Sequence, residues 1–296
     1  MFFIVILTER NTQMKKTVAG FLKMKARGEK ISMLTCYDYS TAVLIEEAGT
    51  DMILVGDSLG NTMLGYEDTL AVTMENMIHH GAAVCRGTSD VFVVVDMPFM
   101  SYQTSVYDAL VNAGRLVKET GCNAVKLEGG AAVCDRIEAI TEAGIPVVAH
   151  IGMTPQSINA FGGFKVQGKN EEKARKILDD AYKVQEAGAF AVVLECVPSP
   201  LAQLISEKLT IPTIGIGAGA GCDGQVLVWQ DMTGVFRGFA PKFVRRYADL
   251  GETMVEAFRS YDRDVKSGAF PEDKHGFSMD EEVIEKVREY DNSREG

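Results

Sequence analysis

Short apolar segments recur along the whole chain, and most of them end on a polar residue or a glycine. Eight of these segments predict buried strands, at residues 31–36, 52–55, 91–95, 124–127, 146–150, 190–194, 212–216 and 225–228. They are rich in Val, Ile and Leu and lack the polar–apolar alternation of half-exposed strands. Continuous apolar character of this kind is typical of parallel strands that are covered on both faces.

Helical patterns separate most of these strands. We predict helices over residues 73–86, 105–120, 131–143, 171–187 and 247–268. Several helices stop at a glycine, as suits the left-handed residue that ends many helices. These glycines are Gly49, Gly87, Gly121, Gly144 and Gly188.

The repeating order of helix, glycine, buried strand and polar tip predicts an α/β fold, a (β/α)8 TIM barrel. An open, doubly wound sheet is the alternative. The glycine-rich segment 215–221 lies late in the chain. A dinucleotide-binding fingerprint would instead follow the first strand of its unit, which favours the barrel.

The organisation of the chain is simple, because no Pro-rich or Gly/Ser-rich linker divides it. We expect one barrel domain over residues 14–268, an N-terminal extension over 1–13 and a charged C-terminal tail over 269–296. Amphipathic patterning begins at Met14, and the apolar residues before it lack the basic region and cleavage site of a signal peptide. In the sequence, no apolar stretch reaches the roughly 18 residues of a membrane span.

Charge and cysteine content narrow the class of function. The net charge of −11 argues against a nucleic-acid partner, because phosphate binding needs concentrated Lys and Arg. The six cysteines show no C-x-x-C spacing, which indicates free thiols in a reducing compartment. We therefore expect a cytoplasmic protein that acts on small molecules.

Three acidic residues stand at or next to the carboxyl ends of predicted strands: Asp57, Asp96 and Glu128. In an α/β barrel these strand ends carry the chemistry. Carboxylates that meet there would repel one another and raise their pKa values unless a cation lies among them. Oxygen ligands suit a hard ion such as Mg²⁺, so the pattern predicts a divalent-metal site. Capping by Asp57 and turn formation by Asp96 are the alternative interpretation.

Three further residues are candidates for chemistry at the same strand ends. Lys126 lies two positions before Glu128, so both side chains point to one face of the strand. A buried lysine needs an anion, which is either Glu128, in a pair that closes the barrel end, or a bound substrate. Glu195 ends another apolar strand and is a candidate for proton transfer. His150 is a candidate for contact with substrate or with a neighbouring ligand.

Seven motifs also carry a family resemblance. They are GDSLG at 56–60, DMPFM at 96–100, VKLEG at 125–129, HIGMTPQ at 150–156, FGGFKVQG at 161–168, LECVP at 194–198 and IGIGAG at 214–219. In this order they resemble the ketopantoate hydroxymethyltransferase family, also called 3-methyl-2-oxobutanoate hydroxymethyltransferases, from about residue 17 to about residue 264.

The resemblance implies a Mg²⁺-dependent transferase of pantothenate and coenzyme A biosynthesis. Its co-substrate would be 5,10-methylenetetrahydrofolate, whose one-carbon unit is added to 3-methyl-2-oxobutanoate through a metal-stabilised enolate, giving ketopantoate and tetrahydrofolate. It implies a (β/α)8 barrel that commonly forms a homodecamer.

The resemblance also implies roles for the candidate residues. Asp57, Asp96 and Glu128 would bind the metal, and Glu195 would accept the substrate proton. The 2-oxo acid would be held by Ser58 and Lys126 with Asp57 and Asp96, and His150 is placed beside it.

One position departs from the family pattern, because Gln230 stands where we expect a histidine. Any folate contact made by that histidine is therefore in doubt. The alternative function is a related Mg²⁺-dependent barrel, a lyase or mutase acting on carbon–carbon or carbon–phosphorus bonds of 2-oxo acids without folate. A non-catalytic, metabolite-binding barrel is a third hypothesis.

Overall fold

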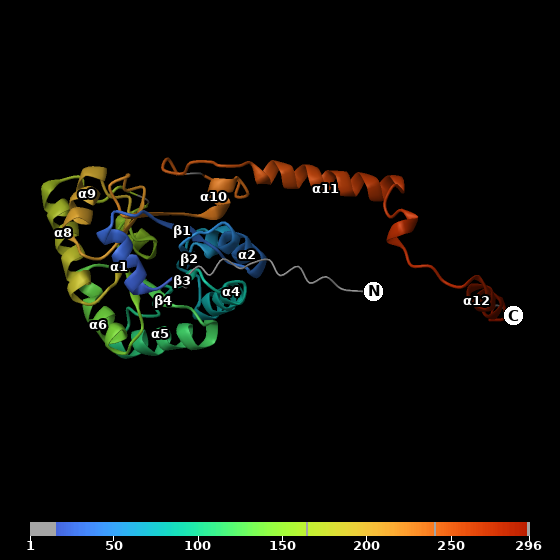
Figure 1. The fold of residues 1–296 in the computed structure, drawn as a ribbon, viewed down its shortest axis with the longest axis horizontal. Helices are drawn as coiled ribbons and strands as arrows, with labels where there is room; N and C mark the ends of the chain where they lie inside the picture. The colour runs from blue at the N-terminus through green and yellow to red at the C-terminus, as the bar shows by residue number, and fades with distance from the viewer. Residues whose placement is uncertain (1–15, 164, 240, 295–296) are drawn as a thin grey trace. The chain divides into compact units, whose positions relative to one another are not determined.

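A computed structural model describes residues 16–163, 165–239 and 241–294 of the chain. Among these residues, eight parallel strands close into a barrel in the order of the sequence (Figure 1). The strands are β1 Ile31–Thr35, β2 Met52–Val55, β3 Phe92–Asp96, β4 Ala124–Glu128, β5 Val147–Gly152, β6 Ala191–Glu195, β7 Thr213–Ile216 and β8 Gly224–Leu227. Each predicted strand is present within two residues at either end, so the (β/α)8 TIM barrel is confirmed.

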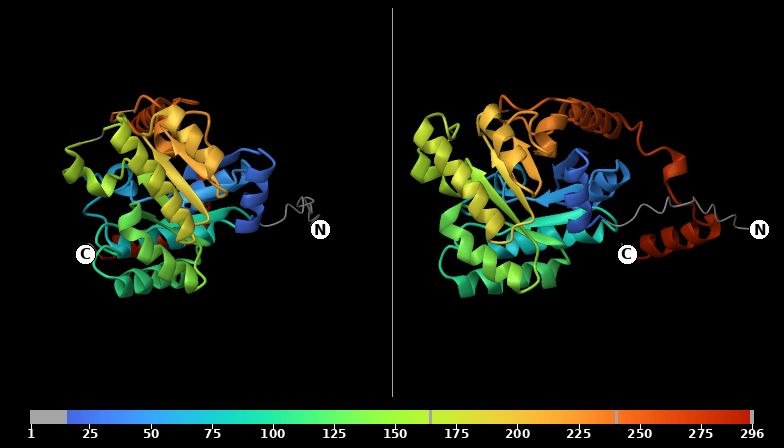
Figure 2. Two further views of the ribbon diagram at one scale, coloured as in Figure 1. Left: turned by 90° about the vertical axis from the view of Figure 1, so that its left-hand side faces the viewer. Right: turned by 60° about the vertical axis from the view of Figure 1, so that its left-hand side comes forward.

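Helices surround the strands, as the two views in Figure 2 show. The longer ones in this part of the chain are α1 Val18–Ala26, α2 Tyr39–Glu47, α4 Met74–Arg86, α5 Val106–Thr120, α6 Cys134–Glu142, α8 Glu171–Glu186 and α9 Ser199–Lys208. The short ones are α3 Leu59–Thr62, η1 Ala131–Val133, η2 Pro155–Ser157, α7 Ile158–Phe161 and α10 Trp229–Thr233.

The predicted helices begin where the sequence supplies a capping side chain. Thr73, Ser105 and Asn170 precede α4, α5 and α8, and each side chain accepts a hydrogen bond from a backbone N–H of the first turn. These bonds satisfy donors that the helix itself leaves without partners. Local sequence therefore sets where these helices start.

Gly87 differs from the prediction that it ends its helix in a left-handed conformation. Its φ is −83°, in the right-handed region. A Cβ atom at this position would lie 2.7 Å from the carbonyl oxygen of Tyr39, so close packing of α4 against the start of α2 explains the glycine. Gly121, at the end of α5, does adopt the left-handed conformation, with a φ of 81°.

The apolar core has two layers, one inside the barrel and one between the barrel and its helices. Phe21 of α1 closes the amino-terminal end of the inner layer. Its ring packs edge-on against Phe92, with centroids 5.2 Å apart, and stacks with Phe190 at 6.5 Å. Such aromatic contacts add to the apolar area that these large side chains bury.

Every second residue of a strand faces the inside of the barrel, and these inward-facing residues change from apolar to charged towards the carboxyl end of the strand. In β3, Phe92 and Val94 belong to the inner core, and Asp96 is the next residue on that face. The strand register aligns Asp96 with Lys126 and Glu128 with His150. The barrel therefore holds a buried charged layer at the carboxyl ends of its strands.

Residues from Ala248 onward form a second compact unit, separate from the unit that ends at Tyr247. It contains α11 Leu250–Ser267, η3 Asp273–His275 and α12 Glu281–Asn292. The helix predicted over 247–268 is present as α11, whereas α12 lies in the segment expected as a charged tail. The domain limits expected at residues 14 and 268 stay predictions, since 1–13 lie outside the described residues and α11 falls in the second unit.

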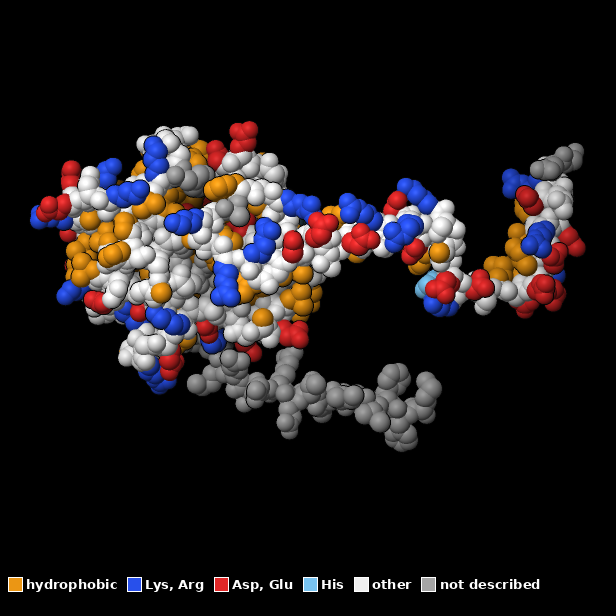
Figure 3. All heavy atoms as spheres, turned by 90° about the horizontal axis from the view of Figure 1, so that it is seen from above, with side chains coloured by type: hydrophobic (Ala, Val, Ile, Leu, Met, Phe, Trp, Pro, Cys, Tyr) orange, Lys and Arg blue, Asp and Glu red, His pale blue; other side chains and the backbone are white. Residues whose placement is uncertain are grey.

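Two surface properties bear on partners. None of the described helices combines the length and the apolar character that a membrane span requires. On the face of the molecule in Figure 3, basic and acidic side chains are interspersed and no single basic field dominates.

Candidate active site at the carboxyl end of the barrel

Asp57, Asp96 and Lys126 meet at the carboxyl ends of neighbouring strands. The backbone N–H of Asp57 donates a hydrogen bond of 3.1 Å to Asp96 Oδ2. The other oxygen of Asp96, Oδ1, lies 3.1 Å from Lys126 Nζ in an ion pair. All three residues are buried, so these charges interact with little solvent between them.

His150 extends this cluster to two further acids. Its Nδ1 lies 3.3 Å from both Lys126 Nζ and Glu128 Oε1. Its Nε2 lies 3.3 Å from Glu195 Oε2, although Nε2 has no aligned hydrogen bond. Six of the seven residues singled out from the sequence are thus linked by direct contacts, from Asp57 to Glu195.

Burial dominates the electrostatics of the two aspartates. It raises the pKa of Asp57 well above its usual range, and repulsion from Glu128 and Asp96 raises it further. Burial also raises the pKa of Asp96, although the neighbouring Lys126 opposes the shift. A carboxylate that lacks water is stable as an anion only beside enough positive charge, which Asp57 does not receive from Lys126 alone.

Glu128, His150 and Lys126 are stabilised in their charged forms. Burial would raise the pKa of Glu128, but His150 and Lys126 outweigh it and hold that pKa below its usual range. Burial and Lys126 both lower the pKa of His150, yet Glu128 and Glu195 prevail and raise it to about 9. Burial likewise disfavours the charged form of Lys126, but the surrounding carboxylates, led by Asp96, raise its pKa above the usual range.

Ser58, the seventh predicted residue, follows Asp57 in the chain and contacts a buried tyrosine. Tyr37 Oη lies 2.8 Å from Ser58 Oγ, and the Tyr37 side chain is buried. On the far side, His80 Nδ1 lies 2.7 Å from the Tyr37 carbonyl oxygen. The hydroxyl of Tyr37 therefore fixes the side chain of Ser58, a role that sequence reasoning missed because nothing in the local pattern marks Tyr37.

Gln156 and Tyr102 are two further buried residues that sequence reasoning missed. Gln156 Nε2 donates to Asp57 Oδ2 at 2.9 Å, and its backbone N–H donates to Glu128 Oε2 at 3.0 Å. Tyr102 Oη lies 2.7 Å from Gln156 Oε1. Gln156 ends the HIGMTPQ motif, which could have indicated it; Tyr102 gave no such signal.

The charged cluster is not arranged as a closed set of metal ligands. Across the described ranges, no group of three or more His, Cys, Asp or Glu side chains is already positioned to hold an ion. The carboxylates contact Lys126, His150 and Gln156 instead. Gln230, in α10, is buried with its Nε2 3.3 Å from Met63 Sδ, and its Oε1 has no hydrogen-bond partner.

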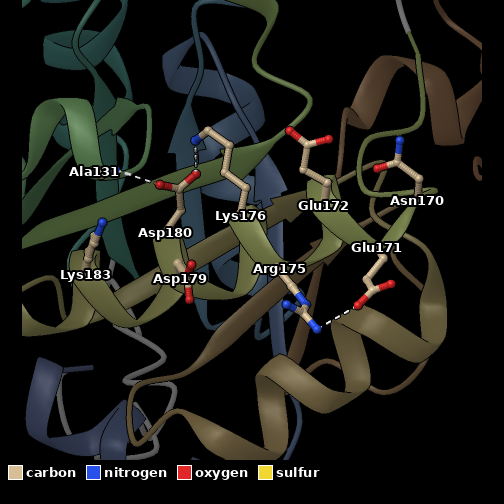
Figure 4. A pocket seen from close by; sticks show the side chains of 9 residues that line it. All are labelled: Ala131, Asn170, Glu171, Glu172, Arg175, Lys176, Asp179, Asp180 and Lys183. Atoms are coloured by element: carbon tan, nitrogen blue, oxygen red, sulfur yellow. Dashed lines mark hydrogen bonds and ion pairs between the residues drawn. The ribbon is translucent and has the colours of Figure 1, made fainter.

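A hollow outside the barrel lies against α8 (Figure 4) and has a volume of about 730 Å³. Four of its charged side chains form two ion pairs. Lys176 Nζ lies 2.6 Å from Asp180 Oδ2, and Arg175 pairs with Glu171 at 2.6 Å. Asp180 also accepts a 2.9 Å hydrogen bond from the Ala131 N–H. The acids and the base suited to catalysis therefore lie inside the barrel rather than here.

Comparison with known proteins places this chain in a family. The sequence model described as ketopantoate hydroxymethyltransferase matches residues 15–273. The chain belongs to the ketopantoate hydroxymethyltransferase family. It is therefore a hydroxymethyltransferase, and the resemblance drawn from the seven motifs is confirmed.

Members of the family with closely similar sequences are known from bacteria. A 3-methyl-2-oxobutanoate hydroxymethyltransferase of Clostridium novyi (strain NT) is 64% identical over 274 residues, which cover 93% of this chain and all of that protein. The protein of the same name from Enterococcus faecalis (strain ATCC 700802 / V583) is 63% identical over the same shares.

Solved structures with the same fold are more distant in sequence. A phosphonopyruvate hydrolase superposes with a TM-score of 0.58 at 15% identity, covering 95% of this chain and 97% of the other. A 2,3-dimethylmalate lyase of the PEP mutase/isocitrate lyase superfamily gives 0.55 at 14% identity, covering 95% and 98%. At these identities the likeness shows the barrel fold alone.

Proposed function

We propose that this chain transfers a hydroxymethyl group from 5,10-methylenetetrahydrofolate to 3-methyl-2-oxobutanoate, giving ketopantoate for pantothenate and coenzyme A biosynthesis. The observation that carries the proposal is the buried cluster of acids around Lys126, in a chain that is 64% identical to a relative named for this substrate. The lyase or mutase alternative is not proposed, because its structural support amounts to a shared fold at about 15% identity.

The residues present fit a divalent cation, and we propose Mg²⁺ bound by Asp57, Asp96 and Glu128. With Asp57, Asp96, Glu128 and Glu195 ionised, the cluster holds four negative charges against the positive charges of Lys126 and His150, which leaves two uncompensated. Asp96 Oδ1 is buried and makes no aligned hydrogen bond, so beside its ion pair with Lys126 it has an oxygen lone pair available to a cation. A structural neighbour, a phosphonopyruvate hydrolase, is known in complex with oxalate and Mg²⁺.

A cation bound there would act as a Lewis acid that polarises the keto carbonyl and acidifies the adjacent C3–H. Lys126 supplies the positive charge for the carboxylate of the 2-oxo acid. Because Lys126 is buried, an anion must remain beside it, and Asp96 fills that role until substrate binds. Ser58, oriented by Tyr37, supplies a hydroxyl beside Asp57 for the same substrate.

Glu195 is the residue we assign to proton transfer. Its side chain is 14% exposed, against 3% for Glu128, so it is the acid that an incoming substrate reaches most easily. Its carboxylate would take the C3 proton and leave an enolate, whose C3 then forms the new bond to the folate-borne methylene. Both carbon–nitrogen bonds of the methylene break, and water supplies the hydroxyl oxygen. The two folate nitrogens take up the C3 proton and one proton of water, so that tetrahydrofolate leaves. His150 Nε2, 3.3 Å away, pairs with the Glu195 carboxylate by charge.

Proton exchange tests this function directly. Proton NMR of 3-methyl-2-oxobutanoate with the protein in D₂O should show loss of the C3–H signal with Mg²⁺ and retention with EDTA. Ketopantoate should then form when methylenetetrahydrofolate is added. Glu195→Gln should keep Mg²⁺ and substrate binding and lose turnover; unchanged turnover would remove Glu195 from the mechanism.

We also propose that the protein is cytoplasmic and forms a homo-oligomer, which the family resemblance suggests is a decamer. An exposed apolar stripe along α11, in the second unit, supports this assembly. Its members recur every three or four residues, and they are Leu250, Met254, Phe258, Tyr261 and Val265. Uncovered stripes of this kind mark protein–protein contact sites. Sedimentation at the mass of a monomer would refute the proposed assembly.

A further inference from the structure

Gln156 makes hydrogen bonds to two of the three acids at once. It lies in η2, just after β5. Its Nε2 donates to Asp57 Oδ2 and to the Met97 carbonyl oxygen, both at 2.9 Å. Its backbone N–H donates to Glu128 Oε2 at 3.0 Å. Gln156 therefore connects the end of β4 to the segment that follows β2.

The orientation of the Gln156 amide is determined by its neighbours. Its carbonyl oxygen faces Tyr102 Oη at 2.7 Å and accepts from Gln103 Nε2 at 3.0 Å. Tyr102 Oη in turn accepts a 3.0 Å hydrogen bond from the N–H of Glu128, and its own proton faces Gln156 Oε1 at 2.7 Å and the Glu128 carbonyl oxygen at 3.1 Å. With donors on the oxygen side, the NH₂ group must face Asp57 and Met97. A buried network satisfied in this way holds one geometry.

Asp57 is the acid that most needs a fixed donor. Burial and two neighbouring carboxylates work against its ionised form, and the Gln156 amide is one of the groups that favour it. Because glutamine is neutral, its hydrogen bond stabilises the carboxylate without adding a cation that would compete for it. The network also leaves Asp57 Oδ1 free of the Gln156 contact, which involves Oδ2.

We propose that Gln156, oriented by Tyr102, is a positioning residue that holds Asp57 and Glu128 close to each other, so that both can bind the divalent cation. This inference rests on the proposed function, in which these acids bind Mg²⁺. Gln156 touches neither substrate nor cation and acts through the two carboxylates. Its loss therefore lowers metal affinity first, and lowers turnover only where metal occupancy falls.

The test is the affinity for Mn²⁺, a paramagnetic stand-in for Mg²⁺, measured on the full chain by the electron paramagnetic resonance of the unbound ion. Gln156→Met keeps the length of the side chain and removes the amide. We expect its Mn²⁺ dissociation constant to rise roughly 10- to 100-fold, the range found when residues that orient metal ligands are lost. At saturating Mg²⁺, kcat should recover towards the wild-type value while the Mg²⁺ requirement stays raised.

Two further variants make the test specific. Tyr102→Phe removes one of the two groups on the Gln156 oxygen and should weaken Mn²⁺ binding in the same direction by a smaller factor; it tests the proposal even if Gln156→Met fails to fold. Gln230→Leu removes a different buried glutamine amide, which contacts Met63, and should leave Mn²⁺ affinity within twofold of wild type.

The outcomes separate this inference from the proposed function. If wild type binds Mn²⁺ and both Gln156→Met and Tyr102→Phe bind it within twofold as tightly, the positioning role is wrong and the metal site stands. A wild-type chain that binds no Mn²⁺ at millimolar concentration overturns the metal site and the positioning role together. An equal loss in Gln230→Leu would assign the effect to general destabilisation and overturn the specific role of Gln156.

Discussion

Replacing Lys126 by methionine tests the electrostatic account of the site most severely. Methionine keeps most of the apolar stem and removes the charge, so the change isolates the ion pair with Asp96, 3.1 Å away. At that distance two unit charges attract by about 5 kcal/mol for an effective dielectric constant near 20. Desolvation of both groups offsets part of this gain, and breaking a buried pair by removing one partner costs about 3–5 kcal/mol.

The expected result is a loss of about 3–5 kcal/mol in the free energy of unfolding, measured by urea denaturation in EDTA at pH 7 and fixed protein concentration. Asp96→Asn in the Lys126→Met background should recover on the order of 2 kcal/mol, because the uncompensated acid is removed. Added Mg²⁺ should raise the stability of Lys126→Met by more than that of wild type, since an ion then supplies the missing charge. A loss below about 1 kcal/mol in EDTA would show that Lys126 and Asp96 are solvated, contrary to their burial.

Three smaller changes test other contacts. Tyr37→Phe removes the hydrogen bond to Ser58 and should raise the KM for 3-methyl-2-oxobutanoate roughly threefold to tenfold at unchanged kcat. An unchanged KM would contradict the role of Tyr37 in orienting Ser58. Burial raises the pKa of Glu46, but three consecutive backbone N–H groups outweigh it and lower that pKa. Wild type should therefore exceed Glu46→Gln in stability by about 1 kcal/mol at pH 7. That advantage should vanish as the pH falls below about 4.3 through the lowered pKa, and an advantage that persisted at pH 2 would refute the assignment. Gly87→Ala should destabilise the protein, because the new Cβ would lie 2.7 Å from the Tyr39 carbonyl oxygen. Gly114→Ala, in α5 where the Cβ meets open space, should stabilise it by about 0.5–1 kcal/mol. Thermal unfolding that ranked the two variants in the opposite order would refute both expectations.

The barrel and its charged layer were predictable because both follow from short-range rules. Unbroken apolar runs indicate strands covered on both faces, and a residue at the carboxyl tip of such a strand lies at the end where barrels carry chemistry. Asp96, Lys126 and Glu128 could be placed on this basis, and the register aligns Asp96 with Lys126 as neighbours. The side-chain period of two along a strand also places Lys126 and Glu128 on one face of β4, whatever the strands beside it.

Contacts that depend on the path of a loop could not be predicted in this way. Gln156 and Asp57 are 99 positions apart, and no periodicity relates the segment after β5 to the segment after β2. Gly87 was misinterpreted for the same reason, since the carbonyl oxygen of Tyr39 that excludes a side chain belongs to another helix. The helix α12 was missed because its segment is dominated by charged residues, which local composition assigns to a solvated tail.

The arrangement of charges explains why this layer can be buried at all. Lys126 lies between Asp96 and His150, and His150 lies beside Glu128 and Glu195, so these three acids each have a cationic neighbour within about 3.3 Å. Asp57 receives its side-chain hydrogen bond from a neutral amide instead. Because Lys126 alone does not supply enough attraction for this last acid, its ionised form depends on hydrogen bonding and, in the function proposed above, on a bound cation. The barrel thus supplies two cationic side chains for four acids, and in the proposed function a bound ion stabilises Asp57 most, because no cationic side chain pairs with it directly.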